Sequence, residues 1–150
     1  MKFGVSIVLG CALILVAGAA EKQIQRKDLP PPVERAVQAQ SAGATIRGFT
    51  QESEHGKIIY EAEMTVSGHG KDISFDTAGN VVAVEEEVSL ESIPTAARAS
   101  IEKTAAGGKI RKVEKVTEGG STTYEAVYTT KAGKSREFSV NADGSPPKRD

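Results

Sequence analysis

The second half of this sequence repeats the first after a shift of 64 positions, and this constrains the fold more than any other feature. The matched residues are Pro30 with Pro94, Ala42-Gly43 with Ala106-Gly107, Ile46 with Ile110, Tyr60-Glu61-Ala62 with Tyr124-Glu125-Ala126, and Thr65 with Thr129. Two copies of one small unit predict a tandem module rather than an enzyme built around one cleft. A unit of roughly 60 residues is only marginally stable alone, so we expect the two copies to share one core.

The first twenty residues predict export. Lys2 precedes an uncharged apolar stretch, and Ala17-Gly18-Ala19 stands just before the polar residues that begin at Glu21. This pattern is typical of a signal peptide, cleaved here after Ala19 or Ala20. The apolar run is also near the lower limit for a membrane span, so an uncleaved N-terminal anchor is the alternative. Cys11 is the only cysteine, and a cleaved chain would therefore have no thiol for catalysis, metal binding or a disulfide.

The rest of the chain predicts an α+β fold of two tandem repeats, each a helix followed by a three- to four-stranded antiparallel sheet. We expect a polar linker at 21–27, the first repeat at 28–88, the second at 89–144 and a flexible tail at 145–150. The clearest strand runs from Lys57 to Val66, because apolar and polar side chains alternate along it with the period of a half-buried strand.

Two local signals refine this prediction. Ile46 and Phe49 are three positions apart in an apolar strand pattern, which predicts a bulge near Gly48. Prolines follow the last predicted strand, and proline lacks the donor that a sheet requires, so the fourth strand of the second repeat is predicted to be missing. The edge left near 138–141 would then be open to a strand from another chain.

Short motifs in both halves resemble the PepSY-like family, also described as beta-lactamase-inhibitor-protein-like. They are Leu29-Pro30, Ile46, Tyr60-Glu61-Ala62 and Asp76-Thr77-Ala78-Gly79, and again Ile93-Pro94, Ile110, Tyr124-Glu125-Ala126 and Asn141-Ala142-Asp143-Gly144. The resemblance covers nearly all of residues 28–144. It implies two helix-plus-sheet units with a broad sheet surface, in a secreted or envelope protein. It also implies a binding or inhibitory role, often toward peptidases or other envelope enzymes.

The sequence contains no recognisable catalytic constellation, cofactor motif or metal-ligand spacing. His55 and His69 both lie in predicted turns, and neither recurs in the second half. Glu85-Glu86-Glu87, with Asp72 and Asp76, could attract a cation. Successive strand residues point to alternate faces, however, so we interpret this run as a solvated edge between the repeats. We therefore predict a protein that is not an enzyme and has no cofactor and no metal.

The outer face of the two central strands is the predicted binding face. Its residues are Glu61, Glu63, Thr65, Glu125 and Thr129. This face is either simply solvated or forms the concave recognition surface that the resemblance implies.

Charge is distributed unevenly between the halves. Residues 28–87 hold 4 Lys and Arg against 11 Asp and Glu, whereas residues 88–150 hold 11 against 8. The difference is either divergence of solvated surfaces or a pair of patches that steer a partner. Basic residues gather at 109–115, but aromatic side chains that would stack on bases are not interleaved with them, so nucleic acid is not an expected partner.

Together these features predict an exported, non-catalytic binding module, in the periplasm or secreted, that inhibits or regulates an envelope enzyme such as a peptidase. No stable membrane insertion is expected once the signal peptide is cleaved. Two alternatives remain open: a small-ligand or ion-sensing accessory domain of the envelope, and a structural protein anchored by its N-terminal helix.

Overall fold

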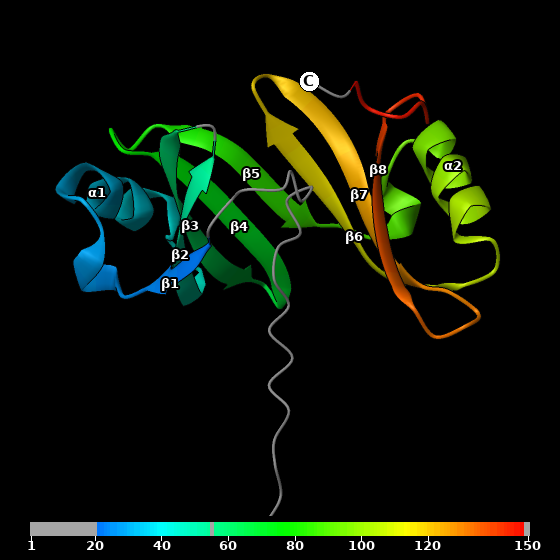
Figure 1. Ribbon diagram of the computed structural model, residues 1–150, viewed down its shortest axis with the longest axis horizontal. Helices are drawn as coiled ribbons and strands as arrows, with labels where there is room; N and C mark the ends of the chain where they lie inside the picture. The colour runs from blue at the N-terminus through cyan, green and yellow to red at the C-terminus, as the bar shows by residue number, and fades with distance from the viewer. Residues whose placement is uncertain (1–20, 55, 149–150) are drawn as a thin grey trace, which may run out of the picture.

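One antiparallel sheet of eight strands, in the order of the sequence, forms the whole scaffold (Figure 1). The computed structural model describes residues 21–54 and 56–148. The strands are β1 (Lys22–Ile24), β2 (Thr45–Glu54), β3 (Lys57–Val66), β4 (His69–Asp76), β5 (Val81–Glu87), β6 (Lys109–Glu118), β7 (Ser121–Thr129) and β8 (Ser135–Asn141). The helices are α1 (Pro31–Gln40) and α2 (Thr95–Ala105), with short 3-10 helices η1 (Arg26–Asp28) and η2 (Leu90–Ser92). The predicted signal peptide lies outside the described residues.

The α+β class is as predicted, but the prediction of two separate helix-plus-sheet units is wrong. Strand β5 pairs with β6 from Ala83 opposite Glu118 to Glu87 opposite Glu114, so the sheet runs unbroken across the middle of the molecule. An isolated second sheet would leave the backbone donors and acceptors at the outer edge of β5 without partners. Pairing β5 with β6 satisfies these groups, and the sequence pattern of either half does not reveal that contact.

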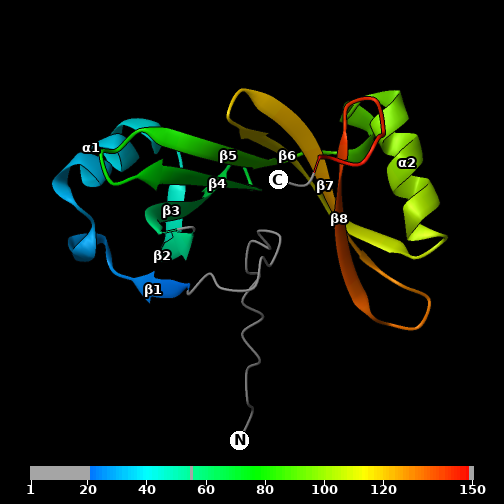
Figure 2. The same cartoon turned by 45° about the horizontal axis from the view of Figure 1, so that its top comes forward.

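Each helix covers one end of the same face of the sheet (Figures 1 and 2). Helix α1 buries Val33 and Val37 against side chains of β2, β3 and β4, among them Phe75, which is fully buried. Helix α2 buries Ala97 and Ile101 against side chains of β6, β7 and β8. The expectation of one shared core is therefore wrong, because the halves have separate apolar clusters and are joined by the sheet.

Several local predictions can be compared directly with the structure. The bulge expected near Gly48 is confirmed, since the β2–β3 register shifts between Ile46 and Gly48. A matching shift lies between Ile110 and Lys112 in β6. The segment expected to be a polar linker contains β1, which pairs with β2 and forms one edge of the sheet.

The segment expected to be a flexible tail begins with a bonded turn. The Asn141 side-chain amide donates to Ser145 Oγ at 2.9 Å and to Pro146 O at 3.2 Å. Within the described ranges, none of the helices has both the length and the apolar character needed to cross a membrane.

Candidate functional site

The face of the sheet that carries no helix is concave (Figures 1 and 2). The strand register places a row of carboxylates on this face. Strand alternation places them there: Tyr60, Ala62 and Met64 of β3 point to the helices, so Glu61 and Glu63 point the other way. Directly opposite residues in paired strands share a face, which extends the row into the neighbouring strands. We call the resulting set the carboxylate cluster: Glu52, Glu61, Glu63, Asp72, Glu85, Glu114, Glu125 and Glu137.

Most of the cluster is buried. Glu61 and Glu114 are each 4% exposed and Glu125 is 9% exposed, whereas Glu63 and Glu137 are half-buried. The solvated alternative for the predicted binding face is thus wrong at Glu61 and Glu125. Thr65 and Thr129, also predicted, lie on the same face and are half-buried. Alternation reveals which face a residue is on, but its burial depends on side chains of neighbouring strands.

Burial raises the pKa of Glu61 to about 8, and the nearby carboxylates of Asp72, Glu85, Glu52 and Glu63 add to the rise. Water would stabilise the charged carboxylate far better than this environment does, and each like charge disfavours ionisation further. Glu61 is therefore held largely as the neutral acid at neutral pH.

Thr50 stands directly opposite Glu61 on β2 and shares its face. Its side chain is 2% exposed, and its hydroxyl oxygen has no hydrogen-bond partner among the described residues. A buried hydroxyl without a hydrogen-bond partner lowers the stability of the folded protein. The cluster beside Glu61 therefore contains one polar group whose hydrogen bonding is incomplete.

The second half of the cluster has the same character. Burial raises the pKa of Glu125 to about 8, with repulsion from Glu137 as the next cause. The pKa of Glu137 is also raised by burial, although the hydrogen bond with Glu125 and the charge of Lys112 oppose the rise. The Ser139 hydroxyl donates to Glu125 Oε2 at 3.2 Å. The two glutamates thus hold a proton between them more readily than isolated carboxyls would.

Glu85 joins the two halves of the cluster. It lies on β5 directly opposite Val116 of β6, and its charge raises the pKa of both Glu61 and Glu125. The interpretation of Glu85-Glu86-Glu87 as a solvated edge is wrong, because β5 is an interior strand and Glu85 is buried. Glu86 points to the helix face, where it forms an ion pair with Lys71 at 2.9 Å.

A few cations offset the negative charge. Arg47 Nη2 lies 3.0 Å from Asp72 Oδ1, and Lys112 Nζ lies 2.8 Å from Glu114 Oε2. Lys112 belongs to the basic run 109–115 of β6 and lies on this face together with Glu114. Carboxylates nevertheless outnumber these cations, so the concave face remains acidic in character.

The cluster does not form a metal centre in the part of the chain that the structure describes. Nowhere among residues 21–54 and 56–148 do three or more Asp, Glu, His or Cys side chains converge in a way that could hold a metal ion. Neighbouring carboxylates instead lie side by side on successive strands. His69 begins β4 beside the turn at Ser67-Gly68, and His55 lies outside the described residues.

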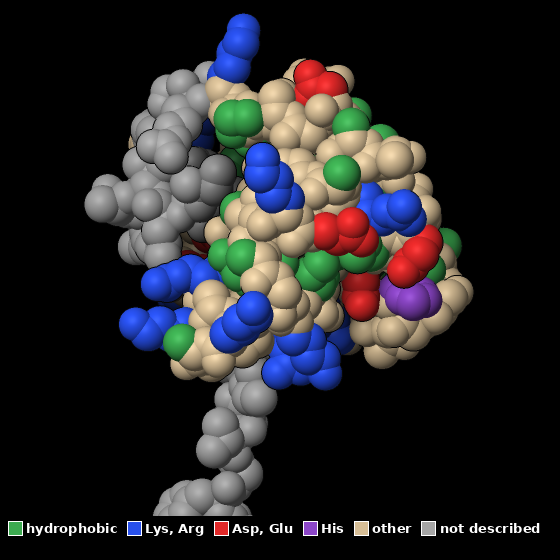
Figure 3. All heavy atoms as spheres, turned by 90° about the vertical axis from the view of Figure 1, so that its right-hand side faces the viewer, with side chains coloured by type: hydrophobic (Ala, Val, Ile, Leu, Met, Phe, Trp, Pro, Cys, Tyr) green, Lys and Arg blue, Asp and Glu red, His purple; other side chains and the backbone are tan. Residues whose placement is uncertain are grey.

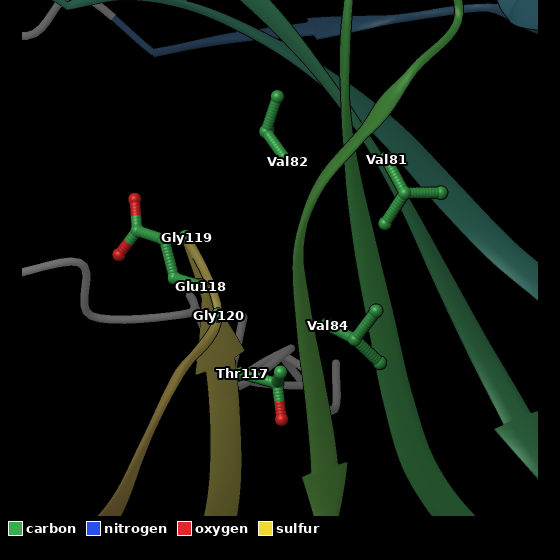
Figure 4. A pocket seen from close by; sticks show the side chains of 7 residues that line it. All are labelled: Val81, Val82, Val84, Thr117, Glu118, Gly119 and Gly120. Carbon is green, nitrogen blue, oxygen red and sulfur yellow. The ribbon is translucent and has the colours of Figure 1, made fainter.

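A shallow hollow lies where the start of β5 passes the β6–β7 hairpin (Figure 4). Its volume is about 550 Å³, and its walls are formed by Val81, Val82 and Val84 with the segment Thr117–Gly120. Val81 is 43% exposed. Only Thr117 and Glu118 supply polar side chains, so the hollow does not bring together a nucleophile, a base and a group to orient them.

Sequence reasoning identified Glu61, Glu63 and Glu125 but missed Thr50, Glu52, Glu114 and Glu137 as members of the same site. The signal was weak for two of these glutamates, because each has an apolar neighbour on one side only: Val113 precedes Glu114, and Phe138 follows Glu137. Assigning them to one site requires the register between strands, which brings Glu114 opposite Glu125.

Several solved structures from Bacteroides species are similar to this chain in fold. A BLIP-like protein from Bacteroides fragilis is 19% identical with a TM-score of 0.54, covering 75% of this chain and 79% of that one. A protein from Bacteroides eggerthii whose proposed location is the periplasm is 15% identical with a TM-score of 0.62, covering 77% and 84%. A DUF2874 family protein from Bacteroides ovatus is 15% identical with a TM-score of 0.61, covering 79% and 84%.

These similarities show that the chain has a BLIP-like, DUF2874-type fold. None of the three proteins is described as an enzyme. No family model matches the sequence, and a search of curated proteins gave no significant match. The broader part of the resemblance, a BLIP-like fold, is therefore confirmed, whereas the similarity to PepSY domains in particular stays a prediction.

Proposed function

We propose that this protein is an exported binding module of the bacterial envelope whose concave face receives a basic surface of a partner protein. The observation that carries the proposal is the carboxylate cluster. It extends over the helix-free face from β2 to β8, and it keeps buried acidic groups that contribute nothing to an apolar core. Isolated buried carboxylates are unfavourable, so a face that concentrates them is better matched to a cationic partner than to water.

The chemistry of the cluster predicts how such a partner would bind. A lysine or arginine that approaches Glu61 or Glu125 stabilises the ionised carboxylate and lowers its pKa from about 8. Binding at neutral pH would therefore release protons and would become tighter as the pH rises. Charge pairs at the rim are screened by salt, so the association rate would fall with ionic strength.

We further propose that the partner is an envelope enzyme, such as a peptidase, which the module inhibits or regulates by covering its surface. The BLIP-like neighbour supports this reading at the level of the fold. The segment 1–20, with its signal-peptide pattern, and the proposed periplasmic location of the Bacteroides eggerthii neighbour support a periplasmic setting.

The test is an affinity capture from envelope extract with three baits: the protein itself, Glu63→Lys and Glu102→Lys. Glu63 is half-buried within the cluster, whereas Glu102 is exposed on α2 and away from the concave face. Both variants change charge by the same amount. We expect one enzyme to be retained by the protein and by Glu102→Lys, lost with Glu63→Lys, and inhibited in its own assay by the purified module.

Equal retention by both variants would contradict the assignment of the concave face. Failure of all three baits to retain an enzyme, together with thermal stabilisation by a small cation or metabolite, would favour the sensing alternative instead.

A further inference from the structure

The turn that follows β8 has the same bonding as the turn between β4 and β5. In the first, the Asp76 N–H donates to Asn80 O at 2.9 Å and the Gly79 N–H donates to Asp76 O at 3.0 Å. In the second, the Asn141 N–H donates to Ser145 O at 2.8 Å and the Gly144 N–H donates to Asn141 O at 2.9 Å. Both are hairpin turns that reverse the chain so that a further strand can pair.

Both turns are also seated on a helix in the same way. Gly79 and Gly144 have φ values of 83° and 80°, in the left-handed region that favours glycine. A Cβ at Gly79 would lie 2.6 Å from Pro32 O of α1, and a Cβ at Gly144 would lie 2.6 Å from Ala96 O of α2. The second turn is therefore held in the same geometry as the first turn, after which β5 begins.

No strand follows the second turn among the described residues. Pro146 and Pro147 come directly after it, and neither has an N–H group to donate to a sheet. Strand β8 is consequently last in the strand order and pairs only with β7 in the described part of the chain. By comparison, β4 pairs on both sides, with β3 and with β5.

The backbone groups that β8 leaves open can be assigned. The Asn141 N–H and C=O are used by the turn and thus point away from β7. Because alternate residues of an antiparallel strand point their backbone groups to the same side, those of Glu137 and Ser139 also point outward. The strand has no proline and no bulge in its pairing with β7, and its charged residues are Arg136 and Glu137.

We propose that β8 is a docking edge that takes an extended segment of another protein as an added antiparallel strand, in the place that β5 occupies beside β4. The pairing of β4 with β5 provides the template for its chemistry: Phe75 faces Val81, Ile73 faces Val84, and Asp72 faces Glu85. The corresponding β8 residues are Val140, Phe138 and Glu137. The incoming strand accordingly places apolar residues opposite Val140 and Phe138.

Besides apolar residues opposite Val140 and Phe138, the incoming strand needs a residue that suits Glu137, which lies on the concave face. Glu137 shares a proton-holding pair with Glu125, so a lysine or arginine opposite Glu137 would neutralise both carboxylates. A second copy of β8 does not offer this cation, because the β8 residues on that face are Ser135, Glu137, Ser139 and Asn141. Charge complementarity therefore favours a different protein as the source of the strand.

The view from the α2 side of Figure 1 shows basic and acidic side chains interspersed and hydrophobic side chains in small separate patches (Figure 3). Among the described residues visible in that view, no broad apolar surface is present to drive docking by itself. Main-chain hydrogen bonds would supply the affinity, as in other cases of strand addition. The side chains opposite Val140, Phe138 and Glu137 would supply the selectivity.

The test uses the full-length chain and a fluorescent synthetic peptide that contains the order valine, threonine, valine, lysine, glutamate within an extended sequence. In the proposed register these residues face Val140, Ser139, Phe138, Glu137 and Arg136. We expect saturable binding by fluorescence anisotropy, and slower hydrogen exchange at the Glu137 and Ser139 amides when the peptide is bound.

Matched peptides test whether the peptide binds β8 in the proposed register. N-methylation of the threonine and the lysine removes the two donors that face β8 and should abolish binding, whereas N-methylation of the central valine removes an outward donor and should not. Glu137→Gln should weaken binding of the lysine peptide but not of one with norleucine in its place.

Three outcomes would overturn the proposal. The first is the absence of saturable binding at millimolar peptide, and the second is equal binding of both N-methylated peptides. The third is a dimer of the free protein that the peptide dissociates, since this would identify a second copy as the occupant of the edge.

Discussion

Replacing Glu61 with glutamine should stabilise this protein at alkaline pH and leave it nearly unchanged in acid. The pKa of Glu61 is raised from its ordinary 4.5 to about 8 in the folded state, chiefly by burial. The folded protein thus holds this proton more tightly than the unfolded chain does. The contribution of Glu61 to stability is complete below the unfolded pKa, and it is lost as the pH rises through the folded value.

The two pKa values set an upper limit to the effect. The interval from 4.5 to about 8 corresponds to roughly 5 kcal/mol of unfolding free energy once Glu61 is fully ionised. Relaxation of the face and entry of water reduce the penalties of buried charges in real proteins. We therefore expect Glu61→Gln, which has the shape of the neutral acid and does not ionise, to gain about 1–3 kcal/mol at about pH 9.

The assay is urea unfolding followed by circular dichroism at a series of pH values, for the protein, for Glu61→Gln and for Glu102→Gln. Glu102 is an exposed glutamate on α2, outside the cluster, and serves as the control for the chemical change itself. The reasoning would be refuted if the stability difference between Glu61→Gln and the parent were the same at acid and alkaline pH. A destabilised Glu61→Gln at alkaline pH would refute it as well, by showing that the charged form is the one the fold favours.

Three further predictions concern stability and are measured by the same unfolding assay. Thr50→Val should stabilise the protein by about 1 kcal/mol, because it removes a buried hydroxyl that has no partner among the described residues, and a loss of stability would show that the hydroxyl is bonded. Gly79→Ala should cost roughly 2–4 kcal/mol, because a Cβ there meets the Pro32 carbonyl, whereas Gly43→Ala, with open space around an equally positive φ, should cost only about 1 kcal/mol; equal losses would contradict the helix-seated turn. Ile101→Ala should cost about 2–5 kcal/mol, since Ile101 is a fully buried residue of α2, and a loss near zero would contradict the packing of that helix on the sheet.

Much of the local structure followed from the sequence. The alternation in 57–66 predicted β3 with its correct bounds. The spacing of Ile46 and Phe49 predicted the bulge, and the prolines after Asn141 predicted that the final hairpin would lack its second strand. These signals are readable because each depends on neighbours within a few residues, through side-chain period, φ preference and the missing proline donor.

The tertiary structure alone decided how the pieces combine. The pairing of β5 with β6 turned two expected sheets into one, and it brought Glu85 between Glu61 and Glu125. The pKa values of these carboxylates depend on their burial and on side chains from strands distant in the sequence. A periodic pattern assigns a residue to a face, but only the register and shape of the assembled sheet determine whether that face is wet, buried or charged.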